Sequence, residues 1–161
     1  MLALIKVTTN ALIYMMNTLS GKWVFDTNLL VYGLDKTSRF HEPTFRLFAS
    51  AEKKKIQIIL TQQNLNEAVQ VFVRYYKKSP LEVTKHLSGL IDDLEITIIS
   101  PQTNTHRHFF DLISKVTSPI DIFDYYLAAT MLDNNINRIL TANAKDFSNI
   151  PNIEVINPFI D

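Results

Sequence analysis

The 161-residue sequence contains no cysteine and only three glycines, and each scarcity removes a class of site. Without cysteine the chain can form no disulfide framework, no thiolate nucleophile and no zinc finger held by thiolates. Gly21, Gly33 and Gly89 lie too far apart for a dinucleotide-binding fingerprint or a phosphate-binding P-loop. Lys plus Arg and Asp plus Glu number 16 each, so no net charge attracts the chain to nucleic acid. Any polyanion must therefore be bound by a local group of residues.

Long uninterrupted apolar runs are absent as well. Lys6 and the polar residues 8–10 interrupt the apolar N-terminal segment, which makes it too short to span a membrane. In a secretory signal positive charge comes first, whereas here four apolar residues precede the lysine. We therefore expect no membrane partner and a cytoplasmic location. An N-terminal extension of uncertain order is expected over residues 1–20, ahead of a single domain over residues 21–161.

The rest of the chain alternates between short apolar runs and longer amphipathic segments. The predicted strands cover residues 23–25, 56–60, 95–99, 138–141 and 153–156. The predicted helices cover residues 41–55, 61–77, 80–93, 103–116 and 118–135, the last with Ser118 as N-cap and Pro119 at its first helical position. This alternation predicts an α/β three-layer sandwich, with a central parallel sheet of four to five strands and helices on both faces.

Acidic and amide residues follow the predicted strands at the edge where open parallel sheets bind ligands. They are Asp26, Thr27 and Asn28 after the first strand, Glu67 in the helix after the second, Asp121 and Asp124 near the start of the last predicted helix, and Thr141, Asn143 and Asp146 after the fourth strand. Carboxylates that meet in one place repel one another unless they are protonated or hold a cation. Oxygen ligands without Cys or His favour Mg²⁺ or Mn²⁺, which would align and activate a phosphodiester for hydrolysis.

Several of these residues also have a purely structural interpretation. Glu67 follows an Asn at the spacing of a capping box, and Asp121 suits the positive end of its helix dipole. Asn143 and Asp146 have the residue types of turns that bond their own backbone. Asp124 is predicted one turn deeper in its helix, at the head of an apolar face, where a carboxylate needs a partner.

Four short segments, in order, resemble the PIN-domain family, and within it the ribonuclease toxins of VapBC toxin–antitoxin pairs. They are residues 24–32 (VFDTNLLVY), 63–67 (QNLNE), 124–130 (DYYLAAT) and 139–147 (ILTANAKDF). The resemblance spans residues 22–158. It implies a Mg²⁺- or Mn²⁺-dependent endoribonuclease, commonly a homodimer, that cleaves RNA as the toxin of a type II pair and is silenced by a cognate antitoxin.

The resemblance also implies roles for individual residues. Asp26, Glu67 and Asp124 match the acids that bind metal in the family. A fourth acidic position falls on Asn143, which is neutral here, and Asp146 could supply the missing charge through water. The residues expected to support this catalytic set are Thr27, Asn28, Asp121 and Thr141. With one carboxylate fewer, we expect one firmly held ion and a second that is held loosely.

Few cations are positioned for RNA binding. Arg39 follows the first motif, and Arg74 and Lys77 are mixed with aromatic residues, as in proteins that bind single strands. Two alternatives stay open beside the toxin. Asn143 and the zero net charge favour a PIN-like binding module that has lost catalysis. The shared chemistry at phosphorus also allows an RNA-processing nuclease outside toxin–antitoxin systems.

Overall fold

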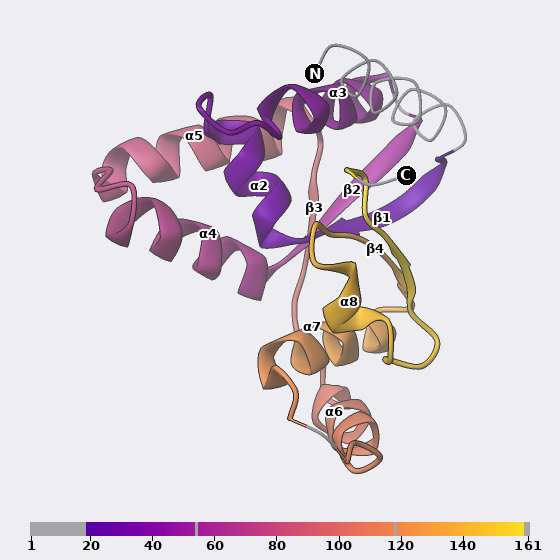
Figure 1. Ribbon diagram of the computed structural model, residues 1–161. Coiled ribbons are helices and arrows are strands. Elements are labelled where there is room, and N and C mark those ends of the chain that lie inside the picture. The colour runs from indigo at the N-terminus through magenta and orange to yellow at the C-terminus, as the bar shows by residue number, and fades with distance from the viewer. Residues whose placement is uncertain (1–18, 54, 118, 160–161) are drawn as a thin grey trace.

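The centre of the computed structural model is a five-stranded sheet, within a structure that describes residues 19–53, 55–117 and 119–159 (Figure 1). The strands are β1 (Gly21–Phe25), β2 (Ile56–Thr61), β3 (Thr97–Ile99), β4 (Arg138–Leu140) and β5 (Glu154–Ile156). Their spatial order is β3-β2-β1-β4-β5, and every neighbouring pair is parallel. The predicted parallel sheet is confirmed, with β1 at its centre.

Helices connect these strands and cover both faces of the sheet. They are α2 (Thr27–Leu34), α3 (His41–Glu52), α4 (Gln62–Arg74), α5 (Pro80–Asp93), α6 (Thr105–Ile113), α7 (Ile122–Asp133) and α8 (Ala144–Phe147). Helices α2 to α5 lie on one face and α6 to α8 on the other, which confirms the predicted three-layer sandwich (Figure 1).

Each face of the sheet packs against its own apolar core, because successive strand residues point to opposite sides. Trp23 and Phe25 of β1 belong to the core beneath α2 to α5, whereas Val24 between them belongs to the core beneath α6 to α8. All three side chains are at most 2% exposed. The residue that follows, Asp26, is therefore attached to a strand that is packed from both sides.

Leu19 and Ser20, the last two residues of the expected extension, are part of the packed structure. Leu19 is buried in the core beneath α2 to α5, and the Ser20 carbonyl accepts hydrogen bonds from Trp23 Nε1 and Arg138 Nη1, both at 3.1 Å. Most of the expected N-terminal extension, residues 1–18, lies outside the described residues. Within the described part of the chain, no helix combines the length and apolar character that a bilayer crossing requires.

The start of α7 differs from the prediction. Residues 119–121 are not helical, and the N-cap is Asp121, whose Oδ1 accepts a hydrogen bond from the Phe123 N–H at 2.9 Å. Ser118, the predicted cap, lies outside the described residues. Because an Asp side chain caps free N–H groups well, the helix begins three residues later than Pro119 suggested. Asp124 consequently lies in the first turn, and the prediction that it lies one turn deeper was wrong.

Helix α2 is absent from the sequence-based expectation. Five of its eight residues are buried, so its sequence lacks the amphipathic period by which helices are recognised. Asp26 caps this helix by accepting a hydrogen bond from the Thr27 N–H at 2.7 Å. Gly33 allows α2 to pack tightly on α3, because a Cβ there would overlap the Phe48 ring.

Candidate active site

Asp26 directly follows β1, the central strand, on the side of the sheet where the carboxyl ends of the strands lie. Its Oδ1 accepts a hydrogen bond from the Thr27 N–H at 2.7 Å. Its Oδ2 accepts one from Asn28 Nδ2 at 2.7 Å and one from Thr141 Oγ1 at 2.6 Å. The Asp26 N–H in turn donates to the Leu140 carbonyl at 3.0 Å. Donors from the ends of two strands thus fix the orientation of one carboxylate.

Asn28 and Thr141 also bind the loop after β4 to the start of α2. Asn28 Nδ2 lies 3.1 Å from Thr141 Oγ1, and Asn28 Oδ1 accepts a hydrogen bond from the Ala142 N–H at 3.2 Å. The Asn143 N–H donates to Thr141 Oγ1 at 3.0 Å. The two contacts of Asn28 join segments more than 110 residues apart in the chain. They are consistent with the supporting roles expected for Thr27, Asn28 and Thr141.

Glu67 reaches the same edge from α4. Thr27 Oγ1 donates a hydrogen bond to Glu67 Oε2 at 2.7 Å, so one residue contacts both acids. The capping box of α4 is formed by Thr61 and Asn64, whose side chains satisfy each other's backbone N–H groups. Glu67 takes no part in that cap, so the capping-box interpretation of Glu67 was wrong. Its carboxylate is held toward Asp26 instead.

Gln63 joins the two sides of the site, and sequence reasoning gave it no role. Its Nε2 donates to Glu67 Oε1 at 2.8 Å and to the Phe123 carbonyl at 3.1 Å, which links α4 to the first turn of α7. Its Oε1 is buried without a hydrogen-bond partner among the described residues. The signal available in the sequence is the four-residue spacing of Gln63 and Glu67, which places both on one face of a helix.

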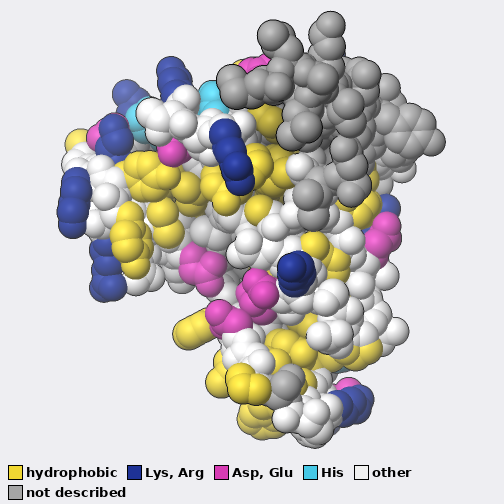
Figure 2. All heavy atoms as spheres, in the orientation of Figure 1, with side chains coloured by type: hydrophobic (Ala, Val, Ile, Leu, Met, Phe, Trp, Pro, Cys, Tyr) yellow, Lys and Arg dark blue, Asp and Glu magenta, His cyan; other side chains and the backbone are white. Residues whose placement is uncertain are grey.

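Asp124 completes the acidic group from α7. Burial, followed by the charges of Asp121, Asp26, Asp146 and Glu67, raises the pKa of the Asp124 carboxyl to about 7. Burial is also the main cause that raises the pKa of Asp26, and the Glu67 charge adds to it. Figure 2 shows acidic side chains gathered near the middle of one face of the molecule. The acids therefore act on one another electrostatically although they come from separate segments.

The donors in this group fit a hard divalent cation. They are carboxylate oxygens, and within the described ranges the Asp124 carboxylate accepts no hydrogen bond and the acids have no Lys, Arg or His ion-pair partner. Carboxylates that are not neutralised in this way repel one another, and a bound cation would relieve that repulsion. In the same ranges, no three Asp, Glu or His side chains already lie close enough to hold an ion together. Binding would therefore require the side chains to close around the ion.

The structure also places the remaining candidates, which are Asp146, Asn143 and Asp121. Asp146 is exposed on α8 and contributes to the raised pKa of Asp124, so its charge acts on the group. Asn143 precedes α8, and its exposed amide makes no capping hydrogen bond there. Asp121 serves as the cap of α7 and also acts on Asp124 through its charge. The proposed roles of Asn143 and Asp146 as ligands stay predictions.

The three cations expected to bind RNA do not contact the acids in the described part of the chain. The Arg39 guanidinium lies over the Phe40 ring, 4.6 Å from its centroid. Arg74 is the last residue of α4, about 10 Å along the helix axis from Glu67. Lys77 follows α4 in a left-handed conformation with φ 55°. Their role in RNA binding stays a prediction.

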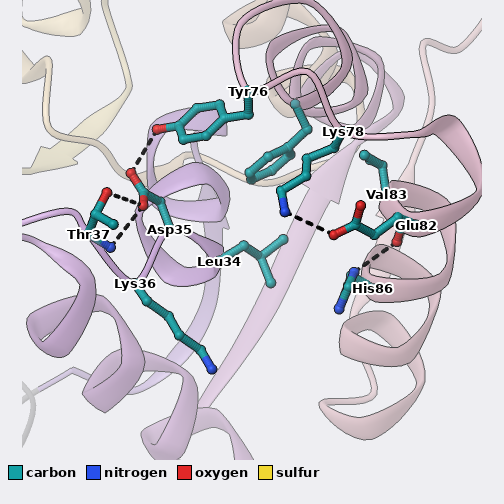
Figure 3. A pocket seen from close by; sticks show the side chains of 10 residues that line it. Leu34, Asp35, Lys36, Thr37, Tyr76, Lys78, Glu82, Val83 and His86 are labelled. Carbon is teal, nitrogen blue, oxygen red and sulfur yellow. Dashed lines mark hydrogen bonds and ion pairs between the residues drawn. The ribbon is translucent and has the colours of Figure 1, made fainter.

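The acidic group is separate from a hollow of about 430 Å³ between α2, α4 and α5 (Figure 3). Leu34, Phe72 and Val83 supply apolar lining. At its rim Tyr76 donates a hydrogen bond to Asp35 Oδ2 at 2.8 Å, and Tyr76 is 40% exposed. Asp26, Glu67 and Asp124 do not line this hollow, so concavity alone does not locate the chemistry.

A model of the PIN-domain family matches residues 23–153, a span that includes Asp26, Glu67 and Asp124. The chain belongs to the PIN-domain family. The resemblance drawn from four short segments is thereby confirmed. No curated protein sequence matches this PIN domain significantly.

Several solved structures are similar in fold to this PIN domain. VapBC2 from Rickettsia felis, bound to promoter DNA, has a TM-score of 0.65 and 20% identity, covering 84% of this chain and 98% of that chain. FitAcB from Neisseria gonorrhoeae has a TM-score of 0.62 and 17% identity, covering 84% and 96%. VapC20 from Mycobacterium tuberculosis, described as a sarcin–ricin loop cleaving toxin, has a TM-score of 0.59 and 10% identity, covering 81% and 97%. At these identities the likeness establishes the fold.

The raised pKa of Asp124 predicts how the stability of the metal-free PIN domain depends on pH. Between about pH 4 and 7 the unfolded chain loses the Asp124 proton while the folded protein keeps it, so stability falls as the pH rises. The Asp124→Asn variant is expected to flatten this dependence. At pH 8 the substitution should raise the Tm by roughly 2–4 °C. This corresponds to about 1 kcal/mol in the free energy of unfolding after allowance for solvent screening.

Thermal unfolding in chelator at pH 5 and pH 8 measures this effect. Asp111→Asn is the matched control, because Asp111 is exposed on α6 and its ion pair with Lys115 contributes little. An Asp124→Asn variant that is no more stable than the wild type at pH 8 would contradict the placement of Asp124 among like charges.

If Glu67 holds a metal ion that serves RNA cleavage, Gln63→Leu should weaken Mn²⁺ binding and RNA cleavage by roughly tenfold, because residues that orient metal ligands carry effects of this size. The substitution removes both hydrogen bonds that hold Glu67 against the first turn of α7. Calorimetric titration with Mn²⁺ measures the first effect. Gln62→Leu is the control, since Gln62 is the exposed neighbour. Equal Mn²⁺ affinity in both variants would show that Gln63 does not position Glu67.

Proposed function

We propose that this PIN domain is a divalent-metal-dependent endoribonuclease and the toxin of a type II toxin–antitoxin pair. The observation that carries the proposal is the electrostatic coupling of Asp26, Glu67 and Asp124 at one sheet edge, without a neutralising cation among the described side chains. A protein gains nothing in stability from gathering like charges. Their joint placement is explained by a ligand that requires them.

In this proposal Asp26, Glu67 and Asp124 hold the Mg²⁺ or Mn²⁺ ion through oxygen atoms. When bound, the ion supplies positive charge to the phosphodiester and lowers the pKa of the attacking water. Asp26 is prepared for this role by three donors, which keep its carboxylate fixed and favour its charged form. Because the pKa of Asp124 is raised to about 7, its carboxyl binds a proton below neutral pH in the protein alone, and a cation would displace that proton.

The chain's own hydrogen bonds also give the site its rigidity. Thr27 contacts Asp26 through its N–H and Glu67 through its hydroxyl, so these two carboxylates cannot reorient independently. Gln63 fixes the other Glu67 oxygen. This preorganisation lowers the cost of placing the oxygen atoms of Asp26 and Glu67 around an ion, so the closing movement falls to Asp124, whose carboxylate accepts no hydrogen bond within the described ranges.

RNA as substrate, a cognate antitoxin, a homodimer and a cytoplasmic location belong to the same proposal. The similar structures support the first two: one is described as a toxin that cleaves the sarcin–ricin loop, and another, from Klebsiella pneumoniae, is described as a toxin–antitoxin complex. The homodimer follows from the family resemblance, and the absence of cysteine fits a reducing compartment.

The test is incubation of purified protein with single-stranded RNA, tRNA and single-stranded DNA in magnesium buffer. Accumulation of shortened RNA with intact DNA is the expected result. Cleavage confined to tRNA would favour an RNA-processing nuclease, and cleavage of DNA would contradict the assignment to RNA.

A binding module without catalysis is the second candidate, and Asn143 at the fourth acidic position favours it. Calorimetric titration with Mn²⁺ separates the two candidates. A heat of binding that disappears in Asp124→Ala supports the nuclease, because that variant removes a proposed ligand. Absence of any heat in the wild type would favour the binding module.

A further inference from the structure

A second hollow, of about 350 Å³, opens beside the acids, between the segment that connects α6 to α7 and helix α8. Its size falls within the range of about 300–1,000 Å³ in which proteins bind small molecules. Among the residues that line it are Lys115, Thr117, Asp121, Tyr125, Lys145 and Asn149. Asp26, Glu67 and Asp124 are not among its lining residues, so this hollow is adjacent to these three acids and distinct from them.

The hollow shares a wall with the acidic group. Asp121 and Asp146 both line it, and the charges of the same two residues act on Asp124. The loop that leads to α8 is held to the site, because the Asn143 N–H donates to Thr141 Oγ1 and Thr141 donates to Asp26. A ligand in the hollow would therefore lie next to a phosphate that is bound at the acids.

Charges of both signs line the hollow, Lys115 and Lys145 together with Asp121 and Asp146. The Lys115 ammonium pairs with Asp111 at 2.7 Å. For Lys145, which is exposed on α8, the described residues provide no ion-pair partner. On the face drawn in Figure 2, a basic side chain borders the acidic group. Since carboxylates repel RNA, a cation beside them is needed to hold the flanking phosphate of a polyanion.

We propose that this hollow binds the nucleotide next to the scissile phosphodiester, with Lys145 paired to the phosphate of that nucleotide. The inference rests on the proposed ribonuclease function and adds a location for its substrate. Thr117 and Asn149 place hydrogen-bonding groups in the lining, which suit the edge of an unpaired base. Lys145 binds substrate in this scheme and leaves the metal ligands unchanged.

The test compares Lys145→Gln and Lys145→Arg with the wild type. Lys85→Gln is the control, because Lys85 is equally exposed but lies on α5, on the opposite face of the sheet. Binding of a labelled single-stranded RNA is measured by fluorescence anisotropy in chelator over a range of salt concentrations. RNA cleavage and Mn²⁺ affinity are measured on the same proteins.

Lys145→Gln is expected to weaken RNA binding roughly fivefold and to reduce the slope of log K against log salt by about 0.7, the value for one lost phosphate contact on a single strand. Lys145→Arg should retain the slope, and Lys85→Gln should match the wild type. The KM for RNA should rise in Lys145→Gln while kcat and Mn²⁺ affinity stay within about twofold.

Three results would overturn the subsite: an unchanged salt slope in Lys145→Gln, an equal loss in Lys85→Gln, or a fall in Mn²⁺ affinity that accounts for the loss of activity. The two proposals fail separately. If the wild type binds RNA through Lys145 but does not cleave it with added metal, the ribonuclease function falls and the nucleotide site stands. If the wild type cleaves RNA and Lys145→Gln keeps the wild-type salt slope, the nucleotide site falls and the ribonuclease function stands.

Discussion

Replacement of Asp26 by Asn is expected to lower the rate of RNA cleavage by roughly 10²–10³-fold, the range seen when one electrostatic group is removed from an active site. Asn has nearly the same shape as Asp but no charge, and one of its two terminal atoms is a donor. That donor would face either the Thr27 N–H or the pair formed by Asn28 Nδ2 and Thr141 Oγ1. The variant therefore loses both the charge and part of the hydrogen bonding that orients the carboxylate.

Loss of activity in Asp26→Asn should occur without loss of the fold. The substitution removes a partly buried charge that the Glu67 carboxylate repels, and this offsets the damaged hydrogen bonds. Cleavage of a labelled RNA and a thermal unfolding curve on the same sample measure the two effects. A folded Asp26→Asn protein that keeps a tenth or more of the wild-type rate would exclude Asp26 from the chemistry.

Removal of divalent metal is expected to reduce cleavage by at least about 10³-fold, and Mg²⁺ or Mn²⁺ should restore it. The reason is the donor set: Asp26, Glu67 and Asp124 offer oxygen alone, which suits these ions better than the sulfur- and nitrogen-preferring Zn²⁺. Activity that persists in chelator would contradict a metal-dependent mechanism, whatever the variants do.

Metal binding has a second consequence that does not depend on activity. At a Mn²⁺ concentration of about 100 Kd, the folded protein should gain about 2.7 kcal/mol, which corresponds to a Tm increase of roughly 5–10 °C. The gain should be larger at pH 8 than at pH 5, because protons compete for a carboxyl whose pKa is raised to about 7. The Asp26→Asn variant should lose most of this gain in stability. Thermal unfolding with and without Mn²⁺ checks both statements.

The helices that sequence reasoning placed correctly have amphipathic patterns and clear caps. Helix α5 begins at Pro80 behind the capping Ser79 and ends at Asp93, as predicted. Helix α2 gave no such signal, because it is buried between the sheet and α3 and its residues are apolar on nearly every side. Periodicity identifies an element by the contrast between its two faces, and an element without that contrast goes unrecognised.

The start of α7 shows a second limit. Ser118, Pro119 and Asp121 are all suitable start residues, and they lie within four positions of one another. Each of them can cap or begin a helix by its residue type alone, so local sequence does not decide which one does. That choice moved Asp124 into the first turn, near the Phe123 carbonyl that Gln63 binds.

The sequence by itself determined that the protein is an α/β sandwich with acids at the strand ends, because strand and helix periods and the residues after each apolar run are local properties of the chain. The tertiary structure alone decided how those acids are held. Thr141 donates to Asp26 across 115 residues, Thr27 joins Asp26 to Glu67, and Gln63 ties Glu67 to α7. Such contacts depend on the order and register of parallel strands, and those are fixed only when the two cores pack against the sheet.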